Sequence, residues 1–188
     1  MINNLLAWSK TQLTGDKLNI KPTDLYFLTE ENMDLTAARA KEKNIRIIND
    51  VPDDTIILTD KERLNIVIRN LLANAVKFTP GGGEVRLHVQ EQPHAITLVV
   101  SDNGMGIPEK YLSRLFADQR FTTLGTSKEK GTGLGLMLCK ELMDGLRGQI
   151  MVESREGKGS SFSIVLPKLA IDTIPKLKER EEPYLIAG

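Results

Sequence analysis

Short apolar strands and amphipathic helices are interspersed along this chain without the regular strand–helix–strand repeat of a parallel α/β protein. Periodicity and capping residues predict helices over residues 23–44, 60–78, 108–115 and 134–146, and strands over 45–48, 55–58, 84–90, 95–101, 149–154 and 160–166. This order predicts an α+β fold. We expect a two-layer α/β sandwich whose mixed, mostly antiparallel sheet is covered on one face by helices.

The length of 188 residues allows one domain of ordinary size with additional chain at both ends. We expect the domain at residues 16–167, after a helix-like stub at 1–15 and before a tail or linker at 168–188. The 25 basic and 25 acidic residues cancel without a long single-sign run, which argues against nucleic-acid binding. A single cysteine, Cys139, excludes an internal disulfide, and no apolar run approaches the ~20 residues of a membrane span.

The helix predicted over residues 61–78 has two different faces. At about 100° per residue, one face is an apolar stripe formed by Leu64, Ile68, Leu71, Leu72 and Ala75. Asn70, Asn74 and Lys77 lie nearly opposite this stripe and within about 60° of one another. They are typical either of a solvated face or of a site for a hydrated cation and phosphates. Mg²⁺ prefers oxygen ligands and retains waters, so one amide oxygen and phosphate oxygens would suffice.

Alternation along the strand that ends at Asp102 places this carboxylate at the end of the buried side. The same side carries the apolar residues Ile96, Leu98 and Val100. A carboxylate in this position needs a hydrogen-bond donor. It is either a turn or cap aspartate, or an acceptor for an exocyclic amino group, which would select adenine over guanine. In the second interpretation, Gly104 and Gly106 let the backbone approach a flat ring.

Three glycines, Gly131, Gly133 and Gly135, lead into the helix predicted at 134–146. The N-terminus of a helix has unpaired N–H groups and a positive dipole end, which together favour phosphate. Flexibility at a helix entry explains such glycines equally well. The segment is neither a Walker motif, since no Gly-Lys-Ser/Thr ends it, nor a Rossmann fingerprint, since no strand precedes it. Residues 117–132 have no period and predict a mobile loop of functional length.

In their order along the chain, these segments resemble the ATP-binding catalytic domain of sensor histidine kinases, within the gyrase–Hsp90–histidine kinase–MutL superfamily. Residues 70–77 resemble its N box, 102–106 its G1 box, 115–116 its F box and 131–136 its G2 box. The likeness also includes 79–83 and 152–162, and it covers roughly 22–167. It implies the Bergerat-type ATP-binding fold.

The resemblance also concerns the ends of the domain. Residues 4–9 resemble the end of the second helix of the dimerisation and histidine-phosphotransfer domain that precedes the kinase core, so the stub at 1–15 is interpreted as this helix end. The chain departs from the family at residues 144–148, where a His-Gly-Gly sequence is common. This departure lies at the end of the last predicted helix and does not involve the four boxes.

The resemblance implies a role for each motif. Asp102 would bind the adenine amino group, Asn70 would hold Mg²⁺, and Asn74 and Lys77 would contact the phosphates. The loop 117–132 would be the ATP lid, in which Arg120, Lys128 or Lys130 contacts the γ-phosphate. The implied ATP-binding residues are Asn70, Asn74, Lys77, Phe78, Asp102, Gly104, Gly106, Ile107, Phe116, Lys128, Lys130, Gly131, Thr132, Gly133, Leu134, Gly135 and Leu136.

Position 70 separates two kinds of chemistry within the superfamily. The ATP-hydrolysing relatives carry a glutamate there that activates water, whereas the Asn70 amide cannot act as a general base. The resemblance therefore implies a protein histidine kinase, a transferase that uses Mg-ATP. The only histidines, His88 and His94, are not followed by the acidic residue typical of a phosphoacceptor. We expect this fragment to be inactive in autophosphorylation alone.

The resemblance also implies the partners. They are the dimerisation and phosphotransfer domain of a longer parent and the receiver domain of a response regulator in a two-component system. We expect no nucleic-acid partner, a monomeric fragment, and a cytoplasmic location as the catalytic part of a membrane-anchored parent. Two alternatives remain: an anti-sigma-type serine kinase of the same superfamily, and a nucleotide-sensing module without transferase activity.

Overall fold

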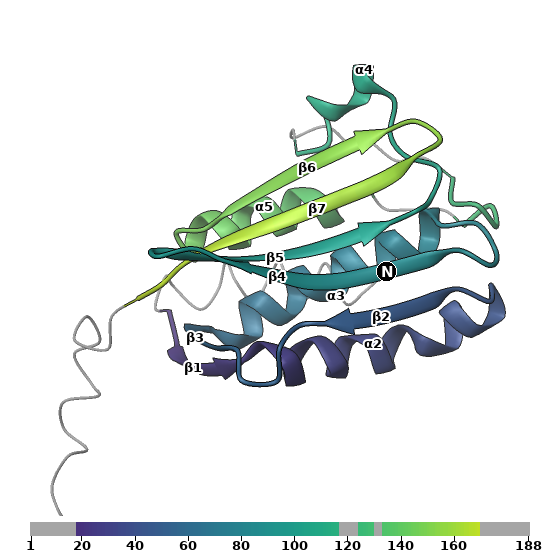
Figure 1. The fold of residues 1–188 in the computed structure, drawn as a ribbon. Coiled ribbons are helices and arrows are strands. Elements are labelled where there is room, and N and C mark those ends of the chain that lie inside the picture. Colours follow the sequence, from purple (N-terminus) through teal and green to yellow (C-terminus); the bar gives the residue numbers. More distant parts are fainter. Residues whose placement is uncertain (1–17, 117–123, 130–132, 170–188) are drawn as a thin grey trace, which may run out of the picture.

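The computed structural model describes residues 18–116, 124–129 and 133–169, shown in Figure 1. The strands are β1 (Ile20–Asp24), β2 (Arg46–Asp50), β3 (Ile56–Asp60), β4 (Glu84–Glu91), β5 (Ala95–Asp102), β6 (Gln149–Arg155) and β7 (Gly159–Pro167). The helices are α2 (Leu25–Glu42), α3 (Lys61–Phe78), α4 (Glu109–Leu112) and α5 (Gly135–Gly145). These elements confirm the predicted α+β class.

The main sheet has five strands in the order β2-β4-β5-β7-β6, and β1 pairs with β3 in a separate two-stranded sheet. β2 runs parallel to β4, whereas the other pairs in the main sheet are antiparallel. Helices α2, α3 and α5 cover one face of the main sheet (Figure 1). The predicted layer of helices on one face of a mixed, mostly antiparallel sheet is therefore confirmed.

Helix α3 lies at the centre of the helical layer, in contact with α2, α5 and β5. Its N-cap Asp60 accepts a hydrogen bond from Arg63 N at 3.1 Å, which satisfies one of the unpaired N–H groups at the helix start. The predicted apolar stripe is buried throughout, and burial extends beyond it to Val67 and Val76. This wide buried surface fixes the rotation of α3. It also leaves Asn70, Asn74 and Lys77 half-buried rather than on a solvated face.

β5 is the central strand of the sheet and pairs with β4 and β7 along its length. Its residues 96–100 are buried on both faces, whereas simple alternation predicted burial of one face only. Thr97 and Val99, which point to the other face of this central strand, are also buried. Asp102, the last residue of β5, is half-buried.

Two elements differ from the sequence-based expectation. Residues 22–24 predicted a helix start with Thr23 or Asp24 as the cap, and Asp24 is the N-cap of α2. Residues 20–24 also form β1, which was not predicted, and Pro22 is paired there opposite Leu58. Pairing with β3 outweighs the local turn signal, and proline is tolerated because this strand has a free edge. The helix that follows is capped by Asp24, whose Oδ1 accepts from Phe27 N at 3.1 Å. The helix predicted at 108–115 is shortened to α4, whose N-cap Pro108 makes no side-chain hydrogen bond.

Several predictions concern residues outside the described part of the chain. They include the stub at 1–15, most of the tail at 168–188, and Arg120, Lys130, Gly131 and Thr132 of the loop 117–132. Within residues 18–116, 124–129 and 133–169, no helix has the length and apolar character needed to cross a membrane.

Candidate functional site

The carboxylate of Asp102 lies where β5 ends and the loop after it begins. Its Oδ1 accepts a hydrogen bond from Gly104 N at 2.8 Å. Burial raises the pKa of this carboxyl from 3.8 to about 6, and hydrogen bonds from the backbone N–H groups of Gly104 and Ser160 offset the shift only in part. Asp102 is therefore ionised at neutral pH but poorly solvated. Such a carboxylate gains from an additional donor, which a ligand could supply.

The loop after β5 is held against two other segments by close backbone contacts. Met105 N donates to Phe78 O at 3.1 Å, which joins the loop to the end of α3. A Cβ on Gly104 would lie 2.5 Å from Phe78 O, and a Cβ on Gly106, whose φ is +66°, would lie 2.1 Å from Arg155 O. Both glycines are therefore required by the approach of the protein's own backbone. The sequence suggested a different reason, the approach of a flat ligand.

Ser154, near the end of β6, holds the other side of the same loop and was not among the predicted site residues. Its Oγ accepts from Ile107 N at 2.8 Å and donates to Gly159 O at 2.9 Å. The Oγ of Ser160 lies 2.9 Å away. In β6 the residues with even numbers face the helices, so Ser154 is the polar end of an otherwise apolar face. The alternation argument that singled out Asp102 would also have found Ser154.

We expect replacement of Ser154 by alanine to loosen the loop after β5. The backbone N–H of Ile107 loses its acceptor, which should lower the free energy of unfolding by about 1–2 kcal/mol. The dissociation constant for ATP should rise about fivefold. Urea denaturation and titration calorimetry measure the two effects. Ser163→Ala on the open face of β7 is the matched control. Equal ATP affinity in the two variants would contradict the role given to Ser154.

Asn70 on α3 meets the start of α5. Its amide nitrogen donates to Ile66 O at 2.8 Å, which turns the amide oxygen away from the helix backbone. A Cβ on Gly135 would lie 3.0 Å from this oxygen. The predicted N box and the start of the helix that follows the glycines are therefore adjacent. The positive end of the α5 dipole therefore lies beside Asn70, and no side chain caps the helix there.

Lys77 and Phe78 form the last turn of α3. The Lys77 ammonium lies 4.5 Å from the centroid of the Phe78 ring. Burial lowers the pKa of Lys77, and the negative charge of Glu129 opposes this shift only in part. The ammonium is thus partly desolvated, and an anion beside it would add a favourable interaction.

The remaining predicted residues differ in how closely they join this site. Ile107, Phe116 and Leu136 are half-buried and pack against the core. Gly133 has a φ of +72°, in the region that favours glycine. Lys128 is exposed, and among the described residues no hydrogen bond or ion pair joins it to Asp102 or Asn70. Lys130, Gly131 and Thr132 lie outside the described residues.

Comparison with known proteins agrees with this geometry. Residues 59–170 match the sequence profile of the family described as histidine kinase-, DNA gyrase B- and HSP90-like ATPase. The autoinducer 2 sensor kinase/phosphatase LuxQ of Vibrio vulnificus is 37% identical over 177 residues, which cover 89% of this chain and 20% of that protein. The adaptive-response sensory kinase SasA of a Synechococcus species is 34% identical over 169 residues, with 89% and 45% covered. The chain thus spans less than half the length of these relatives.

Solved structures have the same architecture. The nucleotide-free catalytic domain of histidine kinase ThkA aligns with a TM-score of 0.70 at 28% identity, over 80% of this chain and 96% of that one. Full-length ShkA in complex with AMPPNP aligns with a TM-score of 0.73 at 28% identity, over 90% of this chain and 35% of that one. The resemblance predicted from the four boxes is confirmed. The chain belongs to the family of histidine kinase-, DNA gyrase B- and HSP90-like ATPases and has the fold of a histidine kinase catalytic domain.

Proposed function

We propose that this chain is the ATP-binding catalytic domain of a two-component sensor histidine kinase, which transfers the γ-phosphate of Mg-ATP to a histidine on a dimerisation domain outside the chain. The observation that carries the proposal is the convergence of two separate segments on α3. The loop after β5 joins the end of α3 through Met105 N and Phe78 O, and the start of α5 meets Asn70. The Asp102 carboxylate, which could accept from a base, and the N-terminus of α5, which could receive phosphates, are thereby positioned by the same helix.

Asp102 supplies the selectivity for adenine in this proposal. At neutral pH the group is a carboxylate, and it accepts a hydrogen bond from the exocyclic amino group of adenine. Guanine presents a carbonyl oxygen at the corresponding ring position, which would face the carboxylate without a donor. The low solvation of Asp102 increases the preference, because a buried charge left without a partner is unfavourable.

The phosphates belong between the start of α5 and the Lys77 ammonium. The first N–H groups of α5 have no acceptor within their own helix, and its dipole favours an anion at this end. Lys77 comes from α3, which also carries Asn70 two turns earlier. Rigid elements thus present the donors, and such pre-organisation is the main requirement of phosphoryl transfer.

The donor set fits Mg²⁺ bound together with a nucleotide. Among residues 18–116, 124–129 and 133–169, no group of three or more His, Cys, Asp or Glu side chains could hold a metal ion. Asn70 directs its amide oxygen toward the start of α5, where the phosphates are proposed to bind. One amide oxygen, phosphate oxygens and waters make a suitable octahedral set for Mg²⁺. The ion would neutralise charge on the phosphates.

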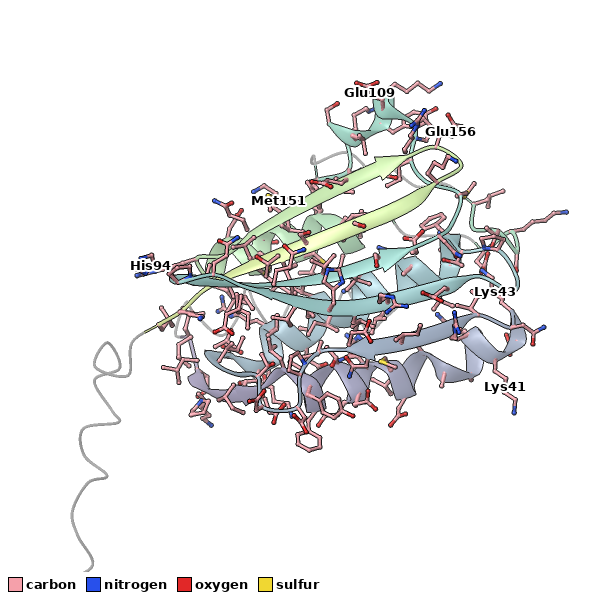
Figure 2. All side chains as sticks on the ribbon, viewed as in Figure 1. Lys41, Lys43, His94, Glu109, Met151 and Glu156 are labelled. Atoms are coloured by element: carbon pink, nitrogen blue, oxygen red, sulfur yellow. The ribbon has the colours of Figure 1, made fainter. Side chains whose placement is uncertain are left out.

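The acceptor of the phosphoryl group must come from outside the described domain. Asn70 cannot activate water, which disfavours hydrolysis. His94 is exposed in the turn before β5 (Figure 2). Asp102 lies at the far end of this eight-residue strand, about 25 Å away at the usual rise of a strand. Val85 and Leu87 of β4 are buried toward the helices. Side chains alternate along a strand, so His88 lies on the open face of the sheet. Neither histidine can therefore reach a phosphate bound at the start of α5.

The proposal includes the partners and location of a longer parent protein. The dimerisation and phosphotransfer domain would present its histidine to the bound ATP, and the receiver domain of a response regulator would take the phosphoryl group from it. The chain would be the cytoplasmic part of a membrane-anchored sensor. Dimerisation of the parent would rest on its dimerisation domain, and we expect the isolated chain to be monomeric.

A transfer experiment tests the proposal. The chain is incubated with γ-labelled Mg-ATP, with and without the dimerisation domain of the same parent. We expect no label on the chain alone and acid-labile phosphohistidine on the added domain. A dimerisation domain with glutamine in place of its histidine is the control and should stay unlabelled. Acid-stable phosphoserine on a partner would instead indicate a serine kinase, and ATP binding without any transfer would indicate a nucleotide-sensing module.

A further inference from the structure

Lys43 lies at the C-terminal end of α2, outside the four boxes, yet its ammonium is in contact with the end of α3. Its Nζ donates to Val76 O at 2.7 Å and to Lys77 O at 3.1 Å. Only 11% of its side chain is exposed. The last carbonyl groups of a helix have no partner within it and carry the negative end of the helix dipole. A cation placed there both satisfies these carbonyls and fixes the end of α3.

The same ammonium also holds the turn formed by residues 125–129. Lys43 Nζ donates to Thr126 Oγ1 at 2.6 Å and lies 3.4 Å from Glu129 Oε1. Thr126 adds its own tie to α3, because its backbone N donates to Lys77 O at 3.1 Å. The turn is closed internally by Gly125 N, which donates to Glu129 O at 2.9 Å. Three segments distant in sequence are therefore joined through one ammonium group.

This turn packs directly on the side chain of Lys77. A Cβ on Gly125 would lie 2.6 Å from Lys77 Cγ and 2.3 Å from Glu129 Oε2. The backbone of the turn is thus in contact with the aliphatic part of Lys77, and the Glu129 charge acts on the Lys77 ammonium. Any movement of the turn away from α3 would remove these contacts from the Lys77 side chain and alter the charge around its ammonium.

We propose that Lys43 is a positioning residue of the ATP site, which holds the 125–129 turn on the end of α3 and thereby fixes the Lys77 ammonium where it meets the ATP phosphates. This inference rests on the proposed function, since it assigns Lys77 to the phosphates. Lys43 itself does not contact the nucleotide. Its effect should therefore depend on the β- and γ-phosphates and leave recognition of the adenosine part unchanged.

Lys43→Met in the full 188-residue chain is the main test, with ATP and AMP as the two probes. Methionine keeps most of the aliphatic length and removes the charge and donors. We expect the dissociation constant for Mg-ATP to rise about tenfold and that for AMP to change less than about twofold. Lys43→Arg, which keeps a cation and its donors, should stay within about threefold of the unchanged chain for Mg-ATP.

Lys41→Met is the matched control. Lys41 lies in the last turn of α2, is exposed and points away from the domain, whereas Lys43 is the C-cap residue of α2 (Figure 2). Thr126→Val removes the Oγ1 that accepts from Lys43 and also donates to Thr79 O at 2.9 Å. It should therefore loosen the turn from α3 and weaken Mg-ATP binding in the same direction. If Lys43→Met does not fold, Thr126→Val tests whether Mg-ATP binding depends on attachment of the 125–129 turn to α3.

Three results would overturn the inference. The first is unchanged Mg-ATP affinity in folded Lys43→Met or in Thr126→Val. The second is an equal loss for ATP and AMP, which would show that Lys43 only supports the fold. The third is absence of ATP binding in the unchanged chain, which would overturn the proposed function and this inference with it. The first two results leave the proposed function intact. Failure of the Lys43 inference can therefore be distinguished from failure of the proposed function.

Discussion

Replacing Asp102 with asparagine should nearly abolish ATP binding while making the domain more stable at neutral pH. The amide can turn its NH₂ group toward the adenine amino group, so that two donors face each other, and the dissociation constant should rise at least about 100-fold. The packing around the group changes little, because the amide oxygen can still accept from Gly104 N. A loss of binding that accompanies a gain of stability cannot be attributed to unfolding.

The gain in stability follows from the raised pKa of Asp102. In the unfolded chain the carboxyl has its ordinary pKa of 3.8, whereas in the folded domain burial raises the pKa to about 6. Above pH 6 the folded state therefore holds an unfavourable charge. As the pH falls from 6 toward 4, the folded state binds a proton that the unfolded state does not, so this contribution to stability increases. Asparagine removes the charge, which should stabilise the domain by about 1–2 kcal/mol at pH 7.5.

Urea denaturation at pH 7.5 and pH 4 measures the difference in the free energy of unfolding, and calorimetry at pH 7.5 measures ATP binding. The gain should be present at pH 7.5 and largely lost at pH 4, where Asp102 is protonated in the folded state and the unfolded chain is already close to its pKa of 3.8. Asp53→Asn, in the exposed turn before β3, is the matched control and should change neither quantity. Wild-type ATP affinity in Asp102→Asn would refute the assignment of the adenine site, and a stability loss at pH 7.5 would refute the charge argument.

The fold was largely predictable because its main elements follow local patterns. The apolar period of α3 predicted its buried stripe, and the aspartate cap predicted where the helix begins. β1 was not predicted, because this segment forms a strand through its pairing with β3. Its local residues Pro22 and Asp24 are instead signals for a helix start. Pairing with a distant strand, as between Pro22 and Leu58, 36 residues later, leaves no periodic trace in a five-residue segment.

The site was predictable to the extent that its residues lie in contiguous motifs. Asp102 ends β5, Asn70 lies within α3 and Gly135 begins α5. Each of these elements has a clear sequence pattern, and the structure brings Asn70 and Gly135 together. Lys43 could not be found in this way, because its partners Val76 and Thr126 are 33 and 83 residues distant. A lysine at a helix end is common, and only tertiary packing shows which carbonyls it meets.

The turn between β6 and β7 contains two glycines whose replacement by alanine should have very different effects. Gly159 has a φ of +94°, and a Cβ there would lie 1.9 Å from Asp102 O and 2.9 Å from Asn103 Cα. Gly157 has a φ of +74°, and nothing lies within 4 Å of the corresponding Cβ. Both variants thus strain the backbone, but only Gly159→Ala also drives a methyl group into the end of β5.

We expect Gly157→Ala to lower the free energy of unfolding by about 1 kcal/mol and Gly159→Ala to lower it by about 3–5 kcal/mol. The methyl group at position 159 must push Asp102 O away, and this displacement also moves the Asp102 carboxylate, the proposed adenine acceptor. The Gly159→Ala fraction that remains folded should therefore bind ATP about tenfold more weakly, whereas Gly157→Ala should bind it normally. Urea denaturation and calorimetry on both variants measure these effects. Equal stability losses would show that backbone strain alone requires glycine at position 159, and that the contact between the β6–β7 turn and Asp102 is not needed to build the site.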